Sequence, residues 1–380
     1  MSNPAASGHE ARTAITTYIF KVASRCNLAC TYCYMYTGPD QSWRDLPVFM
    51  SVETARAVLQ DIAQYADEVG LGSVSIVFHG GEPMLFPASA YRELLKLIDS
   101  ELTSVGVTAN LSIQTNATIL RKETLSALLD AQVGFGVSAD LSDASHDSHR
   151  VDKMGRGSMA RVRLGISAIR DASANSEPQG GLFVIDPSVE PKAALERIES
   201  LGFPFVDVLL PDENWDSADE AELAATYGPW LLELFDLYVS TPRTFQIRWF
   251  QTVFKLALGG VWGSDSLGLR SAGTLIVETD GRYVLHDVLR TASYEVNSTN
   301  RVAGQREISE IAELPGMRAM MDKGSFLHSR CAGCDNLSLC GGGHIAHRYS
   351  TDHGLDNPSV YCSALMPLYE RVRDLTRTGA

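Results

Sequence analysis

A strand and a cysteine loop follow one another in the stretch Ile15-Thr-Thr-Tyr-Ile-Phe-Lys-Val-Ala-Ser-Arg-Cys26-Asn-Leu-Ala-Cys30-Thr-Tyr-Cys33. The apolar and β-branched residues of Ile15–Val22 predict a buried strand, and such a strand delivers the loop after it to the mouth of a barrel. Three thiolates from one short loop can hold three irons of a [4Fe–4S] cluster, which leaves the fourth iron without a protein ligand. The stretch therefore predicts an α/β barrel with a reactive iron–sulfur centre at its mouth.

The remaining cysteines form a second group near the other end of the sequence, and none lies between Cys33 and Cys331. Four thiolates at this spacing can coordinate either zinc or one [4Fe–4S] cluster, and the ligand chemistry alone does not choose between them. Two other interpretations stay open for Cys26, Cys30 and Cys33. They could be buried as small hydrophobic residues, or they could be part of a zinc site that needs a fourth ligand. The second group is Cys331, Cys334, Cys340 and Cys362.

Length and composition exclude several classes of protein. The chain has 380 residues, enough for a large barrel and an appendage, with 45% hydrophobic and 21% charged residues. Its formal net charge of −14 makes nucleic acid a poor partner, and seven cysteines argue against a secreted disulfide framework. The sequence shows neither a bilayer-spanning apolar run nor a signal peptide, so we expect no membrane association and a cytoplasmic location.

Strand and helix patterns alternate up to about residue 245, and this alternation predicts a parallel sheet closing into a partial (β/α)6 TIM-like barrel. The competing fold is a doubly wound sheet, but cysteines stand where its Gly-rich phosphate loop would follow the first strand. Further helices are predicted over Ala218–Ser240 and Phe245–Leu258. The expected strands are Ile15–Val22, Ser73–Phe78, Leu111–Thr115, Gly134–Ser138, Gly181–Ile185 and Phe205–Leu210, and the expected helices between them are Val52–Val69, Ala90–Ser104, Lys122–Asp130, Met159–Ala172 and Pro191–Leu201.

One interval of this acidic chain is basic. Between residues 150 and 170, six arginines and lysines accompany a single acid, Asp152. Two interpretations stay open, a solvated helix face or a docking surface for an acidic leader peptide. The basic residues are Arg150, Lys153, Arg156, Arg161, Arg163 and Arg170.

The cysteine loop resembles the CxxxCxxC signature of the radical S-adenosylmethionine (SAM) enzymes, in which an aromatic residue, here Tyr32, precedes the last cysteine. The stretch His79-Gly80-Gly81-Glu82-Pro83 is similar to the GGEP motif of that family. Paired glycines let backbone carbonyls approach a ligand amine, and a carboxylate compensates its charge. The resemblance implies that SAM binds the open iron of the cluster on Cys26, Cys30 and Cys33, in contact with Tyr32, Gly80, Gly81, Glu82, Pro83, Gln114, Ser138, Asp140 and Arg150.

The C-terminal cysteines resemble a SPASM domain, whose pattern is CxxCx5CxxxC followed by a later cysteine. Here His344 stands where that pattern has its fourth cysteine, and the upstream Gx4C element reads Gly281-Arg-Tyr-Val-Leu-His286. The resemblance therefore implies one auxiliary [4Fe–4S] cluster in place of two, held by the second cysteine group. His286 and His344 could also meet at a vestigial metal site, although two imidazoles without a carboxylate partner usually make hydrogen bonds instead. The implied organisation is a flexible N-terminus (1–14), a radical SAM barrel (15–245), a helical bridge (246–265) and a SPASM-like domain (266–380).

Three stretches carry a closer resemblance: Val277-Glu-Thr-Asp-Gly281, Cys340-Gly-Gly-Gly-His-Ile-Ala-His-Arg-Tyr349 and Asp356-Asn-Pro-Ser-Val-Tyr-Cys362. They closely resemble the FxsB-type subgroup of peptide-modifying radical SAM/SPASM enzymes, and this resemblance covers nearly the whole chain. This resemblance implies that the partners are a ribosomally made precursor peptide and an external electron donor of the flavodoxin or ferredoxin type. The implied product is a cyclophane, a carbon–carbon crosslink between an aromatic side chain and the β-carbon of a nearby residue. Asp212 and Glu213, which follow the sixth strand, are candidates for the base that removes the last proton.

Other functions fit the same motifs. A sister enzyme could form a thioether, epimerise a peptide or make formylglycine on a sulfatase. A non-catalytic iron–sulfur carrier and a zinc-binding module also stay open, although a carrier would leave the open iron and Gly80–Pro83 without a purpose.

Overall fold

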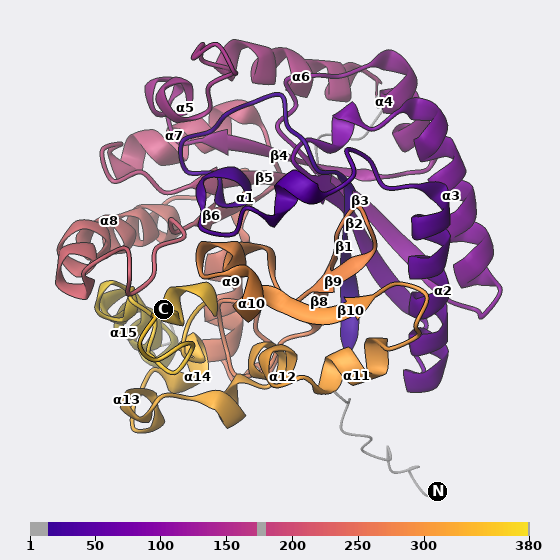
Figure 1. Cartoon of the computed structure of the whole chain (residues 1–380). Helices are drawn as coiled ribbons and strands as arrows, with labels where there is room; N and C mark the ends of the chain where they lie inside the picture. Colours follow the sequence, from indigo (N-terminus) through magenta and orange to yellow (C-terminus); the bar gives the residue numbers. More distant parts are fainter. Residues whose placement is uncertain (1–13, 173–179, 379–380) are drawn as a thin grey trace, which may run out of the picture.

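The computed structural model describes residues 14–172 and 180–378, and in them one ten-stranded sheet organises the whole chain (Figure 1). The predicted flexible segment 1–14 lies outside the described residues except for Ala14. The strand order is β10-β9-β8-β1-β2-β3-β4-β5-β6-β7, with β1 to β7 parallel to one another. The bounds of these seven strands are β1 Ile15–Ala23, β2 Ser73–Gly80, β3 Thr108–Thr115, β4 Gly134–Asp140, β5 Gly180–Val184, β6 Phe205–Leu209 and β7 Gln246–Ile247.

Helices connect the parallel strands and cover the outer face of the curved sheet (Figure 1). Local signals fix their ends. The hydroxyl of Ser51 accepts the amide of Thr54 at the start of α2, and Gly70 ends it with a left-handed φ of 74°. The helices of this part are α1 Tyr34–Thr37, α2 Val52–Val69, α3 Ala88–Thr103, α4 Lys122–Asp130, α5 Asp143–His149, α6 Met159–Ala172, α7 Pro191–Leu201, α8 Glu220–Ser240 and α9 Arg248–Ala257, with 3-10 turns η1 Ser42–Asp45 and η2 Pro83–Leu85.

The C-terminal part joins the same sheet. Strand β8 (Gly273–Val277) pairs in parallel with β1, and β9 (Arg282–Val284) and β10 (Ser298–Val302) follow as antiparallel strands. Helix α15 (Cys362–Thr378) packs along α8, so the end of the chain returns to the barrel. The remaining elements are α10 Tyr294–Asn297, α11 Ile308–Glu313, α12 Pro315–Met321, α13 Ser329–Ala332, α14 Leu337–Cys340, and 3-10 turns η3 Asp287–Thr291, η4 Lys323–Phe326 and η5 Ala346–Arg348.

The predicted α/β partial barrel is confirmed, since β1 to β6 form six parallel strands separated by helices. One expected helix, Phe245–Leu258, is shorter than predicted because Gln246–Ile247 pairs with β6 before α9 begins. A single hydrophobic cluster extends from Ile15 to Val372. The division near residues 245–265 stays a prediction. Within the described ranges, we find no helix with the length and apolar composition needed to cross a membrane.

Candidate active site

The cysteine loop leaves β1 at its carboxyl end and returns through the short helix α1, which begins after Cys33. The amide of Leu28 and the side-chain amide of Asn116 approach the Sγ of Cys26 at 3.4 and 3.7 Å. All three thiols are free of disulfides. Burial, followed by the charge of Glu82, raises the pKa of Cys26 to about 12. Metal binding by this loop would therefore displace thiol protons.

The glycine turn after β2 packs directly on the start of the cysteine loop. The amide of Gly81 donates to the carbonyl of Ala23 at 2.8 Å, and that of Glu82 donates to Arg25 at 3.1 Å. A Cβ on Gly80, whose φ is 131°, would lie 2.0 Å from the carbonyl oxygen of Ala23. The turn thus needs glycine because the two loops touch through their backbones.

The buried side chain of Glu82 connects the glycine turn after β2 to the end of β3 through hydrogen bonds. Its carboxylate accepts the hydroxyl of Thr115 at 2.7 Å and the amides of Asn116 and Met84 at 2.8 Å each. Burial raises the pKa of Glu82 to about 7, against the lowering effect of these hydrogen bonds. Pro83 is buried at the start of η2. Direct contact of Glu82 and Pro83 with SAM stays a prediction, and neither side chain lines a cavity described below.

The polar residues predicted at the ends of β3 and β4 come together, but they partner one another. Gln114 donates to the hydroxyl of Ser138 at 2.8 Å. The hydroxyl of Tyr32 donates to both carboxylate oxygens of Asp140 at 2.7 and 2.8 Å, and Arg150 donates to Asp140 at 3.1 Å. The resemblance predicts that Arg150 contacts SAM, and in the structure its ion-pair partner is the carboxylate of Asp140.

A cavity of about 170 Å³ gathers most of the predicted residues. Its walls present the three cysteines together with donors from the ends of β2, β3 and β4, so the donor set suits a cluster with a bound ligand beside it. Of the predicted site residues, its lining includes Cys26, Cys30, Tyr32, Cys33, Gly80, Gly81, Gln114, Ser138, Arg150 and Asp212.

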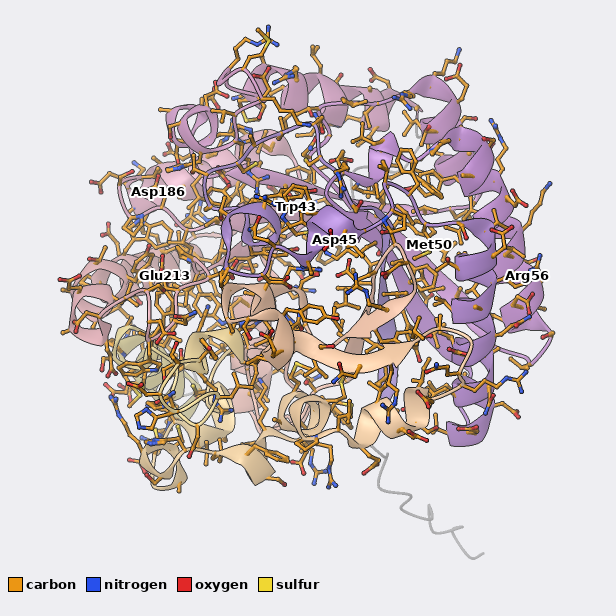
Figure 2. The ribbon with its side chains drawn as sticks, in the orientation of Figure 1. Trp43, Asp45, Met50, Arg56, Asp186 and Glu213 are labelled. Carbon is orange, nitrogen blue, oxygen red and sulfur yellow. The ribbon has the colours of Figure 1, made fainter. Side chains whose placement is uncertain are left out.

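A larger cleft of about 400 Å³ adjoins this cavity and shares Tyr32, Tyr34, Val184, Leu209 and Asp212 with it. The cleft is acidic, because four carboxylate side chains line it. Figure 2 shows two of them, Asp186 and Glu213, on the same side of the molecule. The other two carboxylates are Asp140 and Asp212.

Asp212 is the better placed of the two predicted bases. It lines the cysteine cavity, the acidic cleft and a third cavity of about 150 Å³, whereas Glu213 lines the cleft. Burial raises the pKa of Asp212 to about 7, and the charges of Glu213 and Asp287 add to the rise, while His286 lowers it. A carboxyl with this pKa can both accept and release a proton near neutral pH.

The C-terminal cysteines converge between α13, α14 and the start of α15. Burial raises the pKa of Cys362, and the nearby Cys331 and Cys334 add to the rise. Burial, followed by the charge of Cys362, raises the pKa of Cys340 to about 12. Among the described residues, neither cysteine group has three sulfurs within 4.8 Å of one another.

Several of the basic side chains between residues 150 and 170 form ion pairs with aspartates of this protein. Arg156 and Arg161 pair with Asp152, and Arg163 pairs with Asp143. These contacts favour the solvated helix face over a docking surface for an acidic peptide.

Two residues of the cavity were missed by the sequence prediction. Asn116 contacts Cys26, and it belongs to the stretch that also contains Gln114, so its position could have been found. Tyr34 lines both the cysteine cavity and the cleft and donates to Asp287 at 3.3 Å. Only the fold brings Asp287 to that hydroxyl.

Residues 20–179 match the sequence model of the radical SAM superfamily. This part of the chain is a radical SAM domain. Such a domain implies a [4Fe–4S] cluster that binds SAM. Cys26, Cys30 and Cys33 are free thiols within it, and their role as the cluster ligands stays a prediction. The protein is therefore a radical SAM enzyme. That its C-terminal cysteines hold an auxiliary cluster stays a prediction.

Relatives of this radical SAM enzyme align along most of its length. A cysteine-type anaerobic sulfatase-maturating enzyme of Clostridium novyi is 21% identical over 366 residues, 94% of this chain and 95% of that protein. A serine-type anaerobic sulfatase-maturating enzyme of Klebsiella aerogenes is 25% identical over 336 residues, 86% of this chain and 78% of that protein.

Solved structures share the fold. The structure of native anSMEcpe with bound AdoMet has a TM-score of 0.76 at 20% identity and covers 96% of this chain and 100% of that one. Streptococcus suis SuiB bound to precursor peptide SuiA has a TM-score of 0.52 at 13% identity, over 88% and 72% of the two chains. These likenesses extend the fold match through the C-terminal part that follows the radical SAM domain.

Proposed function

We propose that this radical SAM enzyme oxidises a side chain of a peptide and forms a cyclophane crosslink between an aromatic ring and a neighbouring β-carbon. The observation that supports this is that the cysteine cavity and the 400 Å³ cleft adjoin each other and share the walls formed by Tyr32, Tyr34 and Asp212. A cleft of this size admits two adjacent side chains of a peptide. The peptide backbone would lie across the acidic face that includes Asp186 and Glu213.

The residues of the cleft divide the work. When bound, the SAM cluster would supply radical hydrogen-atom abstraction, and an auxiliary cluster on the C-terminal cysteines would supply an electron acceptor. Tyr34 and Tyr227 offer aromatic walls against which a substrate ring can be held. Asp212 lies on the wall between the two cavities, where it accepts the proton that the ring loses when aromaticity is restored.

Formylglycine formation on a sulfatase is the second candidate. It is favoured by the alignment with sulfatase-maturating enzymes over 94% of this chain. Both reactions begin with removal of a β-hydrogen, so the same cavity serves either one. The difference lies in what captures the resulting carbon centre.

Labelled peptides separate these candidates. A cysteine-free peptide with an aromatic residue and a β-deuterated neighbour should lose two hydrogen isotopes and transfer one deuterium to deoxyadenosine. A sulfatase peptide with its target cysteine or serine is the parallel substrate. An aldehyde on the second peptide and no change in the first would replace the cyclophane proposal. A mass loss without deuterium transfer would place hydrogen abstraction at another carbon and contradict the β-carbon assignment.

The proposal includes the partners and setting of the reaction. We infer a ribosomal precursor peptide as substrate, a flavodoxin or ferredoxin as electron donor, and the cytoplasm as the location. The C-terminal residues would form a SPASM-like domain with one auxiliary cluster on Cys331, Cys334, Cys340 and Cys362.

A further inference from the structure

Two histidines and an aspartate meet beside the third cavity, although they come from distant parts of the sequence. The Nε2 atoms of His286 and His344 lie 3.6 and 3.9 Å from the same oxygen, Oδ2, of Asp265. The two imidazole rings are 4.9 Å apart between centroids. Asp265 precedes β8, His286 precedes η3 and His344 follows α14. The carboxylate partner that the sequence did not reveal is thus present in the fold.

We propose that Asp265, His286 and His344 form a mononuclear site for a divalent first-row transition-metal ion, zinc or ferrous iron in class. Among the described residues, these three offer ligand atoms that all lie within 4.8 Å of one another. Ligands bound at ~2.1 Å to one ion are about 3.0–3.5 Å apart, so a small inward movement completes the geometry. Two imidazoles and one carboxylate suit such ions and leave coordination positions open.

His344 supplies an independent reason to expect a ligand. Its side chain is only 10% exposed, and its Nδ1 is buried without a hydrogen-bond partner among the described residues. Its Nε2 faces Asp265 at 3.9 Å, beyond hydrogen-bond distance. A buried imidazole nitrogen without a partner is costly, and a cation bound by the His344 ring would give that ring one strong interaction.

Asp265 gives the site an entrance and a charge. It is 54% exposed, whereas the imidazoles of His286 and His344 are 12% and 10% exposed, so a cation can enter from the aspartate side. Within the described part of the chain, the ion pairs of Asp265 are with these two imidazoles. The adjoining cavity of about 150 Å³ also reaches Asp212, which leaves room for water or a substrate oxygen on the ion.

The alternative is that the two histidines stay metal-free and interact only with the carboxylate of Asp265. The position of the proton on the His286 ring differs between the metal-bound and the metal-free site. The Nδ1 of His286 accepts the amide of Val288 at 3.3 Å, so in the free protein the proton lies on Nε2. Coordination through Nε2 moves that proton to Nδ1 and opens the contact with Val288.

Zinc analysis of the full-length protein, with both clusters reconstituted anaerobically, tests the site. After incubation with zinc chloride and desalting, we expect about one zinc per chain, because zinc displaces ferrous iron from such ligands. The extended X-ray absorption fine structure at the zinc edge should show a shell of nitrogen and oxygen at ~2.0–2.1 Å with no sulfur at ~2.3 Å. Zinc far below one per chain, or a sulfur shell, would overturn the proposal.

Matched variants locate the metal. Asp265→Asn and His344→Gln should each reduce zinc retention at least tenfold while keeping the iron content. His347→Gln is the control, because His347 lines the same cavity with its ring 5.0 Å from that of His344 but is outside the ligand set. Equal retention in all variants would contradict the assignment. If a variant misfolds, the nitrogen and oxygen shell of the unaltered protein still decides, independently of any peptide reaction.

Discussion

Gly81 is required by the packing of the cysteine loop, whatever ligand lies nearby. A Cβ at this position would lie 2.0 Å from the hydroxyl oxygen of Tyr36 and 2.5 Å from the backbone of Arg25. Contacts this short force the backbone of one loop to move. The motif that suggests ligand binding therefore also maintains the shape of the ligand loop.

Gly81→Ala should lower the free energy of unfolding by ~1–3 kcal/mol and weaken SAM binding, because the displaced backbone lines the cysteine cavity. Anaerobic thermal unfolding and equilibrium binding of SAM measure the two effects. Gly72→Ala is the control, since a Cβ there meets no atom within 4 Å. Unchanged SAM binding in the first variant would show that the turn tolerates a side chain.

Asp212→Asn should slow formation of the peptide product by roughly 10²–10⁴-fold while SAM cleavage continues, because it removes a base and leaves the cysteine loop unchanged. In the unaltered enzyme, the pKa of about 7 means that the carboxylate form grows as pH rises. Product formation should therefore rise through neutral pH, and this rise should vanish in the variant. Glu213→Gln is the comparison, and a larger loss there would reassign the base.

At the scale of elements, the sequence predicted best what local residues determine. Helices α2, α4, α6 and α7 begin and end at the predicted residues. Gly202 ends α7 in a left-handed conformation and Pro191 begins it, both of which are readable signals. Strands β8 to β10 were not predicted as part of the sheet, because pairing between β8 and β1 depends on residues far apart in sequence.

A buried ion pair joins β1 to η3. The Nζ of Lys21 lies 2.5 Å from Asp287, with side chains 0% and 7% exposed, and it also contacts Nδ1 of His79 at 3.0 Å. Asp287→Ala should destabilise the protein by ~3–5 kcal/mol because it leaves a buried ammonium uncompensated. Anaerobic denaturant unfolding measures this loss.

The double variant Lys21→Met with Asp287→Ala tests the cause. It should recover much of the stability, since neither charge then remains buried. If the double variant is less stable than the single one, the loss comes from packing, and the ion pair does not join the two elements as described.

For the whole molecule, two separate cysteine groups predict about eight iron atoms per chain after anaerobic reconstitution, four from each cluster. Replacing Cys26, Cys30 and Cys33 together with alanine should leave about half of the iron and abolish SAM cleavage. Iron and acid-labile sulfide analysis provides the count. An iron content near twelve atoms per chain would mean that a further cluster is present. A colourless protein that contains zinc would support the zinc-binding module instead.

The candidate site was predictable where its residues follow strands in short motifs, as Cys26 and Gln114 do. Their side chains meet because parallel strands end at one edge of the sheet. The sequence could not show that Arg150 is paired with Asp140, or that Asp265 joins His286 and His344. Those contacts depend on how loops cross in space, which neither spacing nor periodicity encodes.

The parallel pairing of β8 with β1 has a consequence during synthesis on the ribosome. The edge of β1 stays without its partner until Gly273–Val277 has emerged. At ~5–20 residues per second, this delay is on the order of 10–50 s. Throughout that interval the sheet that carries the cysteine loop is incomplete along this edge, and contacts with the C-terminal part, such as that of Tyr34 with Asp287, cannot yet form.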